Sequence, residues 1–198
     1  MSSLDLSPEI VDAIGRLKEL HRSGWLDRGI PVEDAESVAD HSFGVAFLVW
    51  VLAPESIDRS RAVELALVHD LAEAVAGDAT PYDREKLQSL DPDTRRNWLN
   101  QRHIRTDEQT AAKRRAETTA IETLAAALSE PQRDRLRSCW NELQARSTAE
   151  AQFVKEMDLL ETWVQSRRYA SRYPDAPMES FELEARDRLG SWELGSGS

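Results

Sequence analysis

The chain has 198 residues, of which 40% are hydrophobic and 31% are charged. This length fits one well-buried core and is too short for two. The formal net charge of −11 at pH 7 argues against binding a nucleic-acid polymer, because such proteins need a basic surface to displace counterions from the phosphate backbone. A small anionic substrate would have to be held by local positive charge, from a bound cation or a few Arg and Lys side chains.

Cys139 is the single cysteine of the chain, which excludes an intrachain disulfide and a thiolate metal cluster. This usage fits a reducing compartment, so we expect a cytoplasmic protein. Residues 1–9 show no basic stretch followed by an apolar run, and no segment reaches the roughly eighteen apolar residues that a membrane span needs. We therefore expect neither a signal peptide nor a membrane span, and we interpret residues 193–198 as a flexible tail.

Apolar spacing with the helical period predicts an all-α chain, and no stretch alternates convincingly as a strand. In chain order, the predicted helices span residues 8–22, 38–53, 60–76, 110–128, 131–146, 148–171 and 178–190. Residues 23–36 contain two glycines and a proline and are predicted as a loop. Trp50 and the other tryptophans outside this loop are interpreted as core or interface aromatics.

End signals accompany several of these helices. The helix 38–53 stops before Pro54, and the helix 60–76 has Ser60 available as a cap at its start and Gly77 at its end. Ser147 and Glu150 have the spacing of a capping box at the start of the helix 148–171.

The segment 78–109 carries two prolines and many charged residues. It is long for a connection without secondary structure inside a compact domain. We expect it either to contain a short helix near Asp93–Arg102 or to act as a mobile cover over a site.

His41, the adjacent pair His69 and Asp70, and Asp158 each lie on a predicted helix among apolar neighbours. Imidazole and carboxylate groups are the usual ligands of divalent ions such as Zn, Mn, Fe and Co. Buried charge needs a partner, and a cation would be one. The alternative is that these side chains are ordinary core residues satisfied by hydrogen bonds, because a His-Asp dipeptide occurs by chance in many chains.

Three segments in this order carry a resemblance to a known family: S-V-A-D-H-S at residues 37–42, L-A-L-V-H-D-L-A-E at residues 65–73, and F-V-K-E-M-D at residues 153–158. Together they resemble the H…HD…D signature of the HD-domain superfamily of metal-dependent phosphohydrolases. The resemblance is closest to the HD-domain 5′-deoxynucleotidases and runs from about Leu17 to about Arg168. It implies a compact helical bundle, here a single HD domain over residues 1–192, that is commonly a homodimer.

The resemblance also implies a ligand set for one divalent metal ion, which could be Mn, Co, Fe, Zn or Mg. These ligands would be His41, His69, Asp70 and Asp158. HD-fold diiron oxygenases need further histidines between the HD pair and the last aspartate, where only His103 is available. A mononuclear hydrolase fits this histidine content better.

Two acidic residues are candidates for catalysis. Glu73 follows His69 by one helical turn, so on a continuous helix it would project from the same face and could orient a water or move its proton. A surface glutamate is the alternative. The resemblance places Asp78, which follows Gly77, near the sugar hydroxyl and the attacking water, whereas a turn-forming aspartate is the alternative.

Three residues are candidates for substrate binding. Lys155 precedes Asp158 by three positions, so its ammonium could reach a substrate phosphate or only that carboxylate. Arg22 can present a planar fork to a phosphate, and Trp25 a rigid apolar surface to a sugar. In the resembling enzymes an Arg and a Trp of this region contact the deoxynucleotide, and the Trp helps to exclude a ribose 2′-hydroxyl.

We therefore predict a phosphohydrolase that removes the 5′-phosphate from (deoxy)nucleoside monophosphates by attack of metal-activated water. Two alternatives stay open: hydrolysis of a different small phosphoester in a specialised pathway, and noncatalytic ligand binding by the same fold. The segment between Asp78 and Ala116 looks longer than in the resembling enzymes, which leaves the substrate range open. We expect a homodimer that binds neither nucleic-acid polymers nor membranes.

Overall fold

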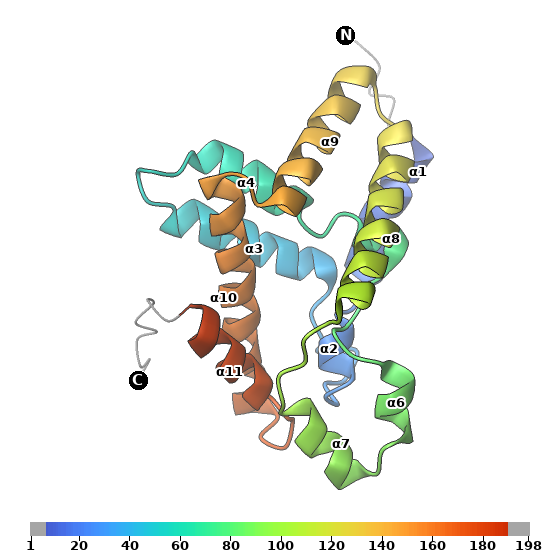
Figure 1. The fold of residues 1–198 in the computed structure, drawn as a ribbon, viewed down its shortest axis with the longest axis vertical. Coiled ribbons are helices and arrows are strands. Elements are labelled where there is room, and N and C mark those ends of the chain that lie inside the picture. The colour runs from blue at the N-terminus through green and yellow to red at the C-terminus, as the bar shows by residue number, and fades with distance from the viewer. Residues whose placement is uncertain (1–6, 190–198) are drawn as a thin grey trace.

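The computed structural model of the protein describes residues 7–189 (Figure 1). The helices are α1 (Pro8–Glu19), α2 (Ser23–Leu26), α3 (Val38–Leu52), α4 (Arg59–Val68), α5 (Glu73–Ala76), α6 (Arg84–Ser89), α7 (Pro92–Leu99), α8 (Asp107–Ala126), α9 (Glu130–Ala145), α10 (Ala149–Arg172) and α11 (Glu179–Arg188). No strand occurs in this range, so the all-α prediction is confirmed. The predicted tail at 193–198 and the ends of the predicted domain 1–192 lie outside the described residues.

Side-chain caps fix where the long helices begin. Ser37 starts α3 in a capping box with Asp40, as each side chain accepts from the backbone N–H of the other residue. Two predicted caps are wrong by one or two residues. Asp58 rather than Ser60 caps α4, and Thr148 caps α10 in place of the predicted Ser147.

The predicted helix 60–76 is broken into α4 and α5 by a tight turn at residues 69–72. The His69 ring Nδ1 donates to the carbonyl oxygen of Ala66 at 2.7 Å. Beyond it, the backbone N–H groups of Leu71, Glu73 and Ala74 donate to carbonyls three residues earlier, the pattern of a tighter turn. His69 and Asp70 therefore lie in the turn after α4 rather than in the middle of a helix.

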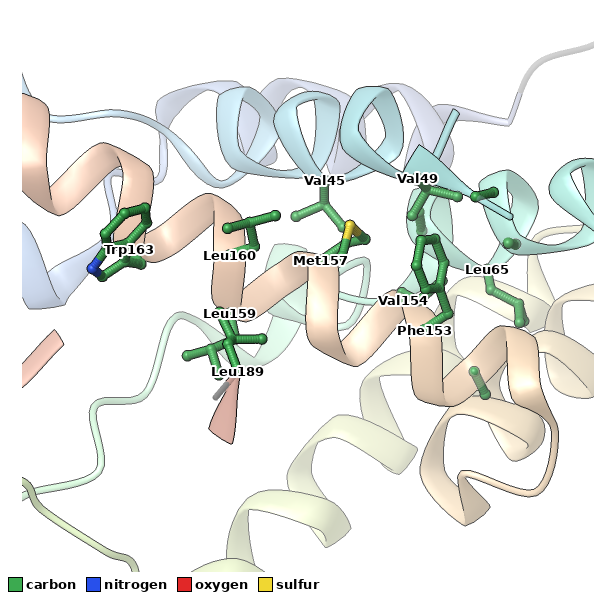
Figure 2. Close-up of a cluster of buried hydrophobic side chains, with 14 of the residues drawn as sticks. Val45, Val49, Leu65, Phe153, Val154, Met157, Leu159, Leu160, Trp163 and Leu189 are labelled. Atoms are coloured by element: carbon green, nitrogen blue, oxygen red, sulfur yellow. The ribbon is translucent and has the colours of Figure 1, made fainter. Parts of the chain in front are cut away.

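The largest hydrophobic core lies where α10 packs against α3 and α4 (Figure 2). Met157 of α10 points toward Val45 of α3, and both side chains are completely buried, as is Leu65 of α4. Full burial of each such side chain stabilises the fold by about 1.5–3 kcal/mol relative to exposure. This packing fixes the His41 end of α3 next to the middle of α10, where Asp158 lies.

A second core joins α1, α5, α8 and α9, with Ala13, Ile121, Leu124 and Trp140 among its buried side chains. It holds the short helix α5 against α8. Because α5 directly follows the His69–Asp70 turn, this core sets the position of the turn from its far side. Among the described residues, no helix combines the length and the apolar character that crossing a membrane requires.

The segment between Asp78 and α8 contains α6 and α7, which lie at the opposite end of the molecule from α9 (Figure 1). The helix expected near Asp93–Arg102 is confirmed as α7, at Pro92–Leu99. A buried guanidinium anchors the segment, since Arg28 donates to Leu99 O at 3.2 Å, to Tyr82 Oη at 3.3 Å and, on the other side, to Ser180 Oγ at 2.9 Å. These hydrogen bonds hold the segment against α2 and α11. The packing therefore does not support the alternative of a mobile cover.

Candidate metal centre and cleft

The four predicted metal ligands converge from three elements: His41 from α3, His69 and Asp70 from the turn after α4, and Asp158 from α10. His41 Nε2 lies 3.2 Å from Asp158 Oδ1 and 3.6 Å from Asp70 Oδ2. His69 Nε2 lies 3.2 Å from the same Asp70 oxygen and 3.4 Å from His41 Nε2. We call this group the metal end of the site.

The spacing of these atoms fits one ion. Ligand atoms bound at 2.0–2.1 Å in a tetrahedral shell lie about 3.4 Å apart, which is close to the separations at the metal end. Ligand atoms of His41, His69 and Asp158 all lie within 4.8 Å of one another. Two imidazole nitrogens and two carboxylates, brought this close inside the protein, form a donor set that calls for a divalent cation.

The pKa shifts of the groups at the metal end also indicate a site for positive charge. Burial would raise the pKa of Asp158, but the charges of Lys155 and His41 outweigh it and hold that pKa well below its ordinary value. Burial and the Arg22 charge would lower the pKa of His41, yet hydrogen bonds to Asp158 and Glu161 raise it to about 9. A positive charge at this point is thus favoured by the surrounding carboxylates.

His69 is oriented by its own helix. Its Nδ1 faces the carbonyl oxygen of Ala66 at 2.7 Å. Because a carbonyl can only accept, Nδ1 must carry the ring proton, and Nε2 presents its lone pair to the metal end. The break in the predicted helix therefore has a direct consequence for ligand geometry.

Glu73 lies beside the metal end although the helix that was expected to carry it is interrupted. Its side chain is buried, at 6% exposure, which excludes the alternative of a surface glutamate. Burial, together with the charges of Asp70 and Asp78, raises the pKa of Glu73 well above its ordinary value, while Lys113 Nζ at 3.7 Å opposes this shift. A buried carboxyl group with a raised pKa beside a metal site is a candidate for general acid–base catalysis.

Asp78 joins the rim of the site to α2. Its Oδ2 accepts from the backbone N–H of Ser23 at 2.6 Å, and its carbonyl oxygen accepts from Ser23 Oγ at 3.2 Å. The preceding Gly77 has φ of 79°, a left-handed conformation that favours glycine. Asp78 therefore stabilises a turn and lines the cleft at the same time.

Lys155 and Arg22 both line the cleft and both already have partners. Lys155 Nζ lies 2.5 Å from Asp158 Oδ2. Arg22 donates to Glu36 Oε1 at 3.2 Å and to Thr162 Oγ1 at 3.1 Å, and it lies 3.1 Å from His41 Nδ1. Their contact with a substrate phosphate stays a prediction.

Trp25 is not brought to the cleft. Its side chain is 1% exposed and packs against Tyr169 and Phe181, and its Nε1 donates to Glu36 Oε1 at 2.8 Å. The predicted loop 23–36 thus contains the short helix α2 and a small apolar core. Contact between Trp25 and a sugar stays a prediction that this packing does not support.

The metal end opens into a cleft of about 700 Å³. The segment from residue 78 to residue 106, which we call the wall, lines part of this cleft and contributes Tyr82, Arg102 and Arg105. Nine Arg and Lys side chains line the cleft, against six Asp and Glu. In a chain with a net charge of −11, this excess is the local positive charge that an anionic ligand requires.

Sequence reasoning missed Glu161 and Glu36. Both carboxylates lie close to His41 and Arg22, and ligand atoms of Glu36, His41 and Glu161 lie within 4.8 Å of one another. A signal for Glu161 was present, because it follows Asp158 by three positions on one helix. Glu36 carried no comparable signal, since a loop brings it to the site.

The sequence is similar to that of known proteins over most of its length. A family model for the HD domain matches residues 14–189. The human 5′-deoxynucleotidase HDDC2 is 33% identical over 156 residues, which cover 79% of this chain and 64% of the human protein. The Xenopus laevis protein of the same name is 32% identical over 161 residues, covering 81% of this chain and 68% of that protein. The chain thus spans less than two thirds of the length of the human relative.

A solved structure has the same fold over most of its length. It is a protein of Pyrococcus horikoshii, which superposes with a TM-score of 0.64 at 29% identity and covers 94% of this chain and 90% of its own.

Proposed function

Because the chain belongs to the HD domain family, we propose that it is a metal-dependent phosphohydrolase that releases the 5′-phosphate of a (deoxy)nucleoside monophosphate. The observation that carries this proposal is the convergence of His41, His69, Asp70 and Asp158 at one end of a cationic cleft. The relatives named 5′-deoxynucleotidase support the choice of substrate.

The four ligands would hold one divalent ion, of Mn, Co, Fe, Zn or Mg. When bound, such an ion supplies a Lewis acid for the phosphoryl group and lowers the pKa of water. Glu73, buried beside the ligands, takes the proton of the attacking water. Asp78, fixed by the Ser23 N–H, orients that water and the sugar at the rim.

Lys155 and Arg22 provide positive charge on the substrate side of the ligands. Lys155 Nζ, which contacts Asp158, has further N–H donors that could reach a phosphate oxygen. Arg22 has donors committed to Glu36 and Thr162, so we assign it a smaller share of phosphate binding.

A different small phosphoester is the second candidate substrate class. Arg102 and Arg105 on the wall favour it, because they add positive charge to the cleft lining beyond Lys155 and Arg22. A substrate with a second anionic group could contact the metal end with one group and these arginines with the other. Noncatalytic ligand binding is the third candidate, and the buried Glu73 beside a complete ligand set argues against it.

We also propose a homodimer formed through α3. Between His41 and Pro54 the helix has no charged residue, and Phe43, Phe47 and Trp50 are 72%, 52% and 60% exposed. Their rings stack with centroids 6.3 Å and 6.2 Å apart. These three side chains alone expose on the order of 350 Å², nearly half of the roughly 800 Å² that one partner buries in a stable interface.

A second copy of the chain suits this face because the face is uncharged. A helix that is apolar on all sides is normally buried on all sides. Elsewhere on the surface, a net charge of −11 per chain opposes self-association.

We also propose a cytoplasmic location, which the single, buried and unbridged Cys139 supports.

The experiment is a phosphate-release screen on purified protein that has been stripped with a chelator and reconstituted separately with Mn²⁺, Co²⁺ and Zn²⁺. The substrates are matched deoxy- and ribonucleoside 5′-monophosphates and a panel of sugar phosphates. We expect metal-dependent release from a nucleoside monophosphate. Release from sugar phosphates alone would move the proposal to the second substrate class, and no release with any metal would contradict it.

A further inference from the structure

We infer that Glu161 is a positioning residue that accepts a hydrogen bond from the Nδ1–H of His41 and so keeps the Nε2 lone pair free for the metal end. The inference rests on the proposed metal site. Glu161 Oε2 lies 2.5 Å from His41 Nδ1. The His41 side chain is completely buried, so water cannot take over as the partner of this nitrogen.

The position of the His41 proton depends on which neighbouring groups can donate and which can accept. An imidazole that binds a metal through one nitrogen keeps its single proton on the other. Two groups compete for Nδ1 of His41: the Glu161 carboxylate at 2.5 Å and Arg22 Nη1 at 3.1 Å. A guanidinium only donates and a carboxylate only accepts, so bonding to Arg22 would move the proton to Nε2 and block the ligand atom. Glu161 prevents this outcome.

The placement of Glu161 has a counterpart on the facing helix. Glu161 follows Asp158 by three positions on α10, and Gly44 follows His41 by three positions on α3. A Cβ atom on Gly44 would lie 2.9 Å from both Cγ and Oε1 of Glu161. Glycine in a helix interior is destabilising relative to alanine. Here it leaves the space that the carboxylate needs between two tightly packed helices.

Arg22 explains why this second group of carboxylates is not itself a metal site. Ligand atoms of Glu36, His41 and Glu161 are close enough to share an ion. However, Arg22 Nη1 lies 3.2 Å from Glu36 Oε1, 3.1 Å from His41 Nδ1 and 4.0 Å from Glu161 Oε2. The guanidinium occupies the position that a cation would take. It balances the two carboxylates while Glu161 remains an acceptor for His41.

Zinc affinity of the chelator-stripped protein, measured by competition with a coloured chelator, tests the inference without reference to any substrate. Glu161→Ala removes the acceptor, and we expect Zn²⁺ to bind about 10- to 100-fold more weakly. Glu161→Gln keeps an acceptor oxygen of the same shape, so its loss should be smaller. Gly44→Ala should also weaken binding, because it displaces the carboxylate without removing it.

Two variants serve as matched controls. Glu156→Ala removes an exposed carboxylate from the same helix, and Gly15→Ala adds a methyl group to the interior of α1, where a Cβ meets nothing within 4 Å. Both should bind Zn²⁺ like the parent protein. A fold check by circular dichroism accompanies each variant, and Glu161→Gln still tests the inference if one of the more disruptive variants fails to fold.

Nitrogen-15 NMR of the Zn²⁺-loaded protein shows directly which ring nitrogen of His41 carries the proton. We expect the parent to show a proton on Nδ1 of His41 in a strong hydrogen bond, and Glu161→Ala to lose that signal or shift it markedly. Parental zinc affinity or an unchanged Nδ1 signal in Glu161→Ala would overturn the inference, as would equal affinity losses for the Ala and Gln variants. A parent protein that binds no Zn²⁺ would instead contradict the proposed metal site.

Discussion

The metal end and the wall of the cleft are held in place by different kinds of interaction. The metal end is fixed by apolar packing of α10 against α3 and α4, so its ligands rest on the most buried part of the molecule. The wall carries a much smaller apolar cluster and is tied to the rest of the chain by buried polar bonds around Arg28 and Asp27. We therefore expect substitutions in the wall to leave metal binding unchanged.

The largest expected effect concerns the metal end. Replacing Asp70 by Ala removes a charged ligand, so we expect bound metal to fall sharply and phosphate release to drop on the order of a thousandfold or more. Metal analysis together with the phosphate-release assay measures both quantities. Unchanged activity on a nucleoside monophosphate would remove Asp70 from the metal site.

Glu73→Gln should separate catalysis from metal binding at the same end. The amide keeps the shape of the side chain and loses its basic oxygen, so we expect kcat to fall by about 100- to 10,000-fold. Metal occupancy should stay close to that of the parent protein. If metal is lost instead, Glu73 is a ligand and the roles proposed for it are wrong.

Arg28→Met tests the wall. The change leaves several buried acceptors without a donor, and we expect the free energy of unfolding to fall by about 3–5 kcal/mol, measured by urea denaturation. If the wall sets substrate choice, KM should rise more than kcat falls, with metal affinity unchanged. Arg96→Met is the control, because the ion pair of Arg96 with Asp175 at 3.8 Å is exposed to solvent. A loss of metal affinity in Arg28→Met would contradict the expectation that the wall and the metal end are held in place independently.

The dimer face carries the smallest expected effect on chemistry. Phe47→Glu places a charge at the centre of the exposed aromatic stripe on α3, so we expect the dimer dissociation constant to rise by at least about thirtyfold in sedimentation experiments. Leu183→Glu on α11, at a similarly exposed apolar position, is the control and should leave it unchanged. A parent protein that is monomeric at high concentration would contradict the proposed interface.

The features that could be predicted from the sequence are the local ones. Helical periodicity located α3 and α10, and the H…HD…D spacing selected four candidate ligands that the fold brings together, because these residues lie within or directly beside helices whose apolar faces define the core. The break after α4 escaped prediction, since the apolar period continues through residues 69–72 while the bond from the His69 ring to Ala66 O ends the helix.

The features that could not be predicted depend on contacts between distant parts of the chain. The bonds that Arg28 makes join it to residues 54, 71 and 152 positions away in sequence. Burial of Trp25 depends in the same way on Tyr169 and Phe181, which no local pattern places next to it. For this reason the sequence suggested a substrate contact for a side chain that the fold uses as core.

The most direct test of the central claim is a metal titration of the chelator-stripped protein, with phosphate release from a deoxynucleoside 5′-monophosphate measured at each step. If the metal end binds one divalent ion that supports hydrolysis, activity should rise in proportion to bound metal and level off at one ion per chain. Full activity in the stripped protein, or metal bound at one ion per chain with no phosphate released from any phosphoester tested, would contradict the account.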